Sequence, residues 1–186
     1  MSGPLIYSGL PFNATPMSKR ATFFSFLAAA SLTACSFASY SAVEYNNLLA
    51  EDINVSSSAI EATATAYNDL IPNRVDEAAV IPVKDLEDVY QDATESLPEV
   101  KGLLELTSKN AEQQASLQAA ITTYVAAAEA YLETYGKILA YYESETYKED
   151  LSQVAVLDEL LHTDYTTFIE ANNDLSAAME TYVSKS

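Results

Sequence analysis

The residues of this chain whose types and spacing indicate a specific chemistry are Leu32, Thr33, Ala34 and Cys35. They close a short apolar stretch near the N-terminus. A branched apolar residue three places before a cysteine, with small residues between them, is the pattern of the bacterial lipobox. In that motif the chain is cleaved before the cysteine, and the thiol carries a diacylglycerol through a thioether. We therefore predict that Cys35 is a lipid attachment site and that Leu32, Thr33 and Ala34 form the cleavage motif.

Two other interpretations of Cys35 explain the sequence less well. Cys35 is the only cysteine in the chain, so it has no partner for an internal disulfide and no second thiol to share a zinc ion. An ordinary secretion signal cleaved after Ala38 is the other alternative. Neither interpretation explains why the thiol lies where an apolar leader ends, so lipidation is the better hypothesis.

The segment before Cys35 has the composition of an export signal. Lys19 and Arg20 form a basic start, and residues 21–32 are apolar apart from scattered Ser and Thr. This apolar segment is shorter than the roughly 20 residues that a helix needs to cross a bilayer. We therefore expect a leader that is removed, with Met17 a better translation start than Met1.

These features divide the chain into three parts. We predict a signal peptide at residues 1–34, a lipidated cysteine and short tether at residues 35–42, and an acidic helical domain at residues 43–186. The length of the last part is sufficient for one domain with its own core.

The charge balance excludes several classes of partner. The chain holds 27 acidic and nine basic residues, and removal of the predicted signal takes away Lys19 and Arg20. The mature chain would therefore have a net charge of about −20 with its one histidine neutral. Such a field repels phosphate groups, so neither nucleic acid nor direct binding to anionic headgroups is expected.

Apolar residues recur at spacings of three and four throughout residues 43–186, which predicts an all-α fold. The expected helices cover residues 43–71, 85–107, 108–142 and 151–182. Four amphipathic segments joined by short connections favour an antiparallel up-down bundle. We expect the last two helices to pair most tightly, Pro98 to kink or split the second helical region, and Ser56, Ser57 and Ser58 to weaken the first helix.

Candidate metal ligands and catalytic groups are few. Glu159 and His162 have the Glu-x-x-His spacing of di-iron bundles, but such a site needs a second pair and His162 is the only histidine. The expected interpretation is a solvent-facing histidine beside Asp158 and Glu159. Covalent haem attachment would need Cys-x-x-Cys-His, which the sequence lacks. We predict no metal, no cofactor and no catalytic residues.

Two further groups of residues could mark a surface with a function. Several tyrosines could line a groove for sugar or peptide, although core packing is the simpler explanation: Tyr124, Tyr131, Tyr135, Tyr141, Tyr142 and Tyr147. Tyr141 lies off the apolar seam and is the least explained of them. A run of acids lacks the spacing of a calcium loop and is expected to be a solvated helix face: Asp85, Glu87, Asp88, Asp92 and Glu95.

The chain also resembles a known family. The residues that carry the resemblance are the lipobox at Cys35, an opening Glu44-Tyr45-Asn46-Asn47, Tyr67-Asn68, Tyr141-Tyr142-Glu143 and Tyr147-Lys148-Glu149-Asp150. They are similar to the YiiG-like family of bacterial lipoproteins, which have a domain of unknown function. The resemblance spans most of residues 35–183. It implies a lipid-anchored helical domain in the cell envelope and no established catalytic or binding residues.

The expected function is that of a lipid-anchored envelope protein whose acidic helical domain binds or scaffolds an unidentified envelope protein or ligand. Ser36 follows the predicted lipidated residue, and with no aspartate there we expect the outer membrane, facing the periplasm. One alternative is a metal- or haem-handling bundle that uses Glu159 and His162. Another is a secreted helical protein that adheres to surfaces, in which Asn13 and Asn54 would be glycosylation acceptors.

Overall fold

A computed structural model describes residues 40–71, 75–76, 78–105 and 111–184 of the chain. The predicted lipobox, Leu32 to Cys35, and the predicted signal peptide lie outside these residues. The described part contains four α-helices, α1 (Ala42–Leu70), α2 (Val83–Leu103), α3 (Ala111–Glu143) and α4 (Ser152–Ser184), and one short 3-10 helix, η1 (Thr146–Lys148). It contains no β-strand, so the predicted all-α fold is confirmed.

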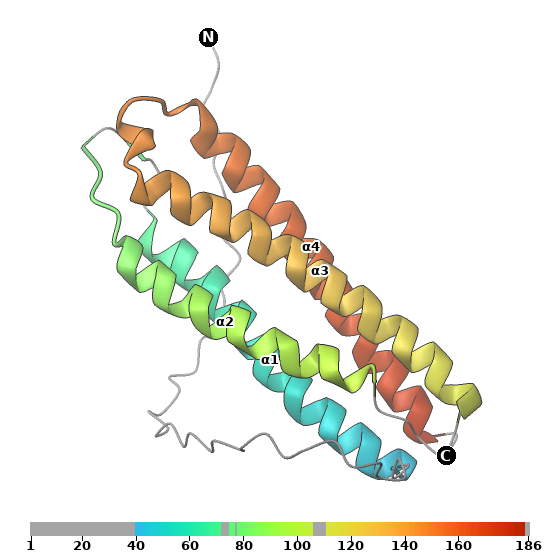
Figure 1. The fold of residues 1–186 in the computed structure, drawn as a ribbon. Helices are drawn as coiled ribbons and strands as arrows, with labels where there is room; N and C mark the ends of the chain where they lie inside the picture. Colours follow the sequence, from blue (N-terminus) through green and yellow to red (C-terminus); the bar gives the residue numbers. More distant parts are fainter. Residues whose placement is uncertain (1–39, 72–74, 77, 106–110, 185–186) are drawn as a thin grey trace. The chain divides into compact units, whose positions relative to one another are not determined.

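The helices form an antiparallel bundle in which successive helices alternate in direction (Figure 1). The most extensive packing joins α3 to α4, followed by α1 to α2 and then α2 to α3. The expected close pairing of the last two helices is therefore confirmed. The packing of α1 against α4 is the sparsest of the four neighbouring pairs.

The predicted apolar seams form the core. Tyr45, Leu49 and Ile60 of α1 are fully buried, as are Leu117 and Ile121 of α3. Side chains three and four positions apart lie on one face of a helix, so each seam presents a continuous surface to its neighbours. This packing accounts for most of the fold that the sequence pattern predicts.

The start of α1 is fixed by a capping box that the apolar periodicity does not reveal. Ser41 is the N-cap, and its hydroxyl accepts a hydrogen bond from the Glu44 backbone N–H at 3.3 Å. The Glu44 carboxylate accepts in return from the Ser41 backbone N–H at 2.8 Å. These bonds satisfy backbone donors that a helix start leaves free. The helix therefore begins within one residue of the expected position.

The two expected weak points lie within unbroken helices, which contradicts only the predicted split at Pro98. The serine run does not interrupt α1, because Ser56 and Ser57 are buried inside the bundle. Pro98 does not split the second helical region, since α2 continues through it to Leu103. Proline removes one backbone hydrogen bond. Leu97 and Val100, however, are buried on either side of it and hold the helix against its neighbours.

The reversal between α3 and α4 is more ordered than its charged composition suggests. Tyr147 of η1 is buried, and its hydroxyl donates to the backbone oxygen of Ala79 at 2.8 Å. Tyr141 is also buried and donates to the backbone oxygen of Asp150 at 2.5 Å. The two tyrosines therefore tie the reversal together and connect it to the α1–α2 connection. This placement explains Tyr141, which the seam pattern left unexplained.

Candidate functional site

The metal-site hypothesis depends on Glu159 and His162 facing inward. Both residues are exposed on α4. Among the described residues, no cluster of three or more His, Cys, Asp or Glu side chains is placed to hold a metal ion. The Glu-x-x-His spacing therefore does not correspond to an inward-facing ligand pair.

The tyrosines lie mainly in the core. Tyr131 of α3 packs against Tyr165 and Phe168 of α4, with ring centroids 5.5 and 6.4 Å apart, and Tyr124 lies 5.4 Å from Phe168. Burial raises the pKa of Tyr124 and Tyr131, so both hydroxyls stay protonated at neutral pH. Their rings contribute apolar area to the core while the hydroxyls hydrogen-bond to polar partners. They do not line an aromatic groove.

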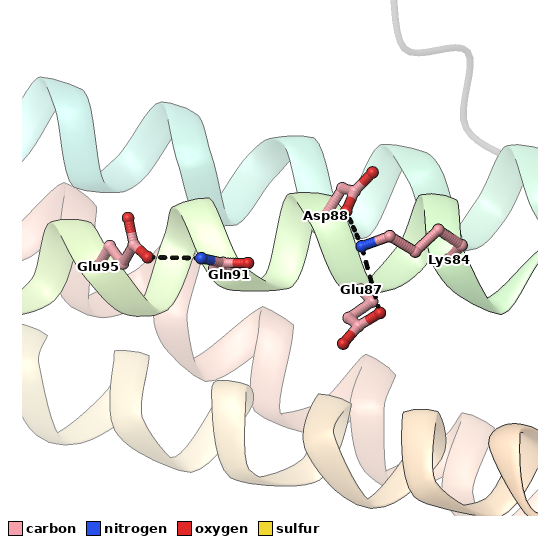
Figure 2. Close-up of polar contacts among 5 residues, drawn as sticks. All are labelled: Lys84, Glu87, Asp88, Gln91 and Glu95. Atoms are coloured by element: carbon pink, nitrogen blue, oxygen red, sulfur yellow. Dashed lines mark hydrogen bonds and ion pairs between the residues drawn. The ribbon is translucent and has the colours of Figure 1, made fainter.

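The acidic run of α2 forms a solvated face (Figure 2). Lys84 bridges to Glu87 at 3.4 Å and also contacts Asp88, and Gln91 donates to Glu95 at 2.7 Å. All five side chains are exposed. Such contacts along one helix surface contribute only a few tenths of a kcal/mol each. The arrangement agrees with the expected solubilising face.

A different feature is the strongest candidate for a site. A groove of about 630 Å³ runs between α1 and α4. These two helices are the most sparsely packed of the neighbouring pairs. The polar lining of the groove comprises three asparagines and four serines: Asn46, Asn54, Asn172, Ser57, Ser58, Ser176 and Ser184. Glu61 and Glu180 add two carboxylates. The volume lies within the range of small-molecule sites in proteins, about 300–1,000 Å³.

A chain of hydrogen bonds connects this groove to the core. The Ser57 hydroxyl donates to Oδ1 of Asn172 at 3.0 Å. Its single hydrogen is then used, so the Tyr124 hydroxyl must donate to the Ser57 oxygen, 3.0 Å away. The chain runs from Tyr124 through Ser57 to Asn172. It fixes the positions of α1, α3 and α4 relative to one another at the level of the groove.

One acceptor in the groove has no partner in the structure. Oδ1 of Asn46 is buried and accepts no hydrogen bond from any described residue. A buried carboxamide oxygen without a donor is costly, about 1–3 kcal/mol. This oxygen has almost no solvent-accessible surface, so it is not a contact point for a ligand in the open groove.

The groove does not follow from the residue pattern of either helix alone. Its polar lining residues have the pattern of solvent-facing positions on two separate helices. Only the pairing of Ser57 with a residue 115 positions later shows that they face each other. The serine run in an otherwise regular apolar seam was the one available indication.

Comparison with known proteins adds no identification, since the sequence matches no family model, no curated protein and no solved structure. The resemblance to YiiG-like lipoproteins therefore stays a prediction. Within the described residues, none of the helices combines the length and the apolar character that crossing a bilayer requires.

Proposed function

We propose that this protein is a lipid-anchored cell-envelope protein, held at the membrane through Cys35, whose acidic helical domain is a binding or scaffolding module without catalytic activity. The observation that carries the proposal is the lipobox, Leu32 to Cys35, after a basic and apolar leader. The YiiG-like resemblance supports the same placement. The proposed location is the outer membrane, facing the periplasm.

The predicted tether between the anchor and the domain is short. The N-cap of α1 is Ser41, six residues after Cys35. A short connection of this kind would keep the domain close to the membrane surface. Multiple acyl chains on one cysteine hold a protein firmly, because each buried methylene contributes about 0.8 kcal/mol.

The surface of the domain supports binding through polar and electrostatic contacts. Its predicted net charge of about −20 favours cationic partners. The α1–α4 groove offers hydrogen-bonding groups in a space of suitable size. The metal-handling alternative loses its main support, because Glu159 and His162 are exposed.

The proposal is tested by fractionating a diderm bacterial host that produces the full chain with Cys35 or with Cys35→Ala. We expect the chain with Cys35 in the membrane fraction and Cys35→Ala shifted out of it or retained as an uncleaved precursor. The matched control is Ser36→Ala, which changes the next residue and keeps the thiol, and it should fractionate like the unchanged protein. Equal membrane association of the Cys35→Ala chain in its processed form would refute the anchor.

A further inference from the structure

We propose that the α1–α4 groove binds a linear aliphatic polyamine, with its ammonium groups held by the two carboxylates of the groove and its methylenes lying on the apolar part of the lining. This inference deepens the proposed role as a binding module and rests on it. It does not depend on the lipid anchor.

The acidic groups of the groove lie toward its two ends. Tyr45 of α1 contacts Tyr182 of α4, and Ser57 bonds to Asn172, which sets the antiparallel register of the two helices. Glu180 therefore lies level with the first turns of α1, whereas Glu61 lies one turn beyond Ser57. About 13 residues separate the two levels, which is roughly 20 Å at a rise of 1.5 Å per residue. This spacing favours an elongated ligand with positive charge at both ends.

The surface between these carboxylates suits a methylene chain. Ala50, Ile53, Met179 and Val183 supply apolar contacts along the groove. The exposed side-chain oxygens of Asn54 and Ser58 supply acceptors for an ammonium or secondary amine N–H. A polyamine has this alternation of N–H donors and short apolar segments along one chain.

Other small ligands fit the lining less well. Of the described residues that line the groove, none is lysine or arginine, so an anionic ligand would find no charge partner there. None of them is aromatic either. Sugars and nucleobases are commonly held by stacking on aromatic rings. Both the charge and the side-chain types therefore favour a flexible aliphatic cation.

The test is calorimetric titration of the full chain, purified in a non-ionic detergent, with spermine at about 0.15 M salt, where the Debye length is about 8 Å and the general field of the domain is screened. We expect saturable binding with one site per chain. Glu61→Gln and Glu180→Gln should each weaken binding about fivefold, the upper end expected for a solvent-accessible ion pair. Putrescine, which is too short to reach both carboxylates, should bind more weakly than spermine.

Matched controls separate this site from general attraction to an acidic protein. Glu51→Gln in α1 and Glu170→Gln in α4 remove the same charge from exposed positions outside the groove lining, and they should change the affinity less than twofold. Circular dichroism should show that all four variants stay helical. Absence of saturable binding, equal weakening by the control variants, or tighter binding of a lysine-rich peptide than of spermine would overturn the proposal. None of these results would bear on the anchor, which fractionation tests separately.

Discussion

The two faces of α4 differ in what they contact. Toward α3, the helix buries Phe168 among Tyr124, Tyr131 and Tyr165, with ring centroids 5.4 to 6.4 Å apart. Toward α1, it packs Tyr182 against Tyr45 near one end and presents asparagine, serine and glutamate side chains, with Met179 and Val183, to an open groove. The same helix therefore supplies a densely packed aromatic interface on one side and an accessible polar surface on the other.

This difference indicates a division of roles within the bundle. Aromatic packing contributes apolar burial, which is the dominant favourable term in folding. Polar groups in a loosely packed interface contribute less to stability, but they remain available for a ligand. We infer that α3 and α4 hold the fold together, while α1 and α4 form the surface through which the module acts.

The largest change in stability is expected when an aromatic ring is removed from the α3–α4 interface. Phe168→Ala should lower the free energy of unfolding by about 3–5 kcal/mol, because it leaves a cavity in a packed core. Met179→Ala, which removes a half-buried groove residue from the same helix, should cost much less. Urea unfolding followed by circular dichroism measures both. Equal losses for the two variants would contradict the proposed division of roles.

A second test removes the hydrogen-bond chain between core and groove and measures its contribution to stability. Ser57→Ala removes both the acceptor for Tyr124 and the donor to Asn172, so we expect a loss of about 1–3 kcal/mol in the free energy of unfolding. Ser58→Ala changes an exposed neighbour and should stay within about 0.5 kcal/mol of the unchanged protein. If Ser58→Ala cost as much as Ser57→Ala, the buried chain would not be the cause.

The smallest expected effect is a pH-dependent change in stability from Asp52, on the side of α1 that faces α2. Partial burial raises the pKa of Asp52, and the neighbouring Glu99 and Glu51 raise it further. Because the folded state binds this proton more tightly than the unfolded chain, the contribution of Asp52 favours folding at low pH and is lost as the pH rises through the folded-state pKa. Asp52→Asn should therefore stabilise the protein at pH 7, by less than about 1 kcal/mol because the group is largely solvated.

Unfolding at two pH values measures this effect. The gain from Asp52→Asn should shrink toward zero below about pH 3, where the carboxyl is protonated in both states. Asp69→Asn, at an exposed position on the same helix, controls for the loss of one negative charge. A gain from Asp52→Asn that is the same at pH 7 and at low pH would show that titration of Asp52 is not responsible.

The sequence predicts the helices well, because the core follows from periodicity within each segment. Leu117, Ile121 and Tyr124 recur at spacings of three and four, and all three are buried. The groove could not be predicted in the same way. Its serines look like weak helix positions until Tyr124 and Asn172, 67 and 115 residues away, are placed beside Ser57. Long-range pairing of polar side chains leaves no periodic pattern in a single helix.

The reversal at residues 143–150 also depends on a long-range contact that its local sequence does not reveal. Its charges correctly predict a connection, but they give no indication that Tyr147 bonds to Ala79, 68 residues earlier. At Pro98 the local sequence predicts a break that the structure does not have. Local propensity disfavours proline inside a helix, whereas packing on both sides of it keeps α2 continuous. In each case tertiary contacts determine a feature of the fold that the local sequence does not predict.

The proposed anchoring of the domain through Cys35 has a direct chemical signature. The measurement that tests it most directly is the mass of the N-terminal peptide of the mature chain, released by protease from the membrane fraction. We expect a peptide that begins at Cys35 and carries the added mass of a diacylglycerol thioether. A mature chain that begins after Cys35, or one in which Cys35 carries an unmodified thiol, would contradict it.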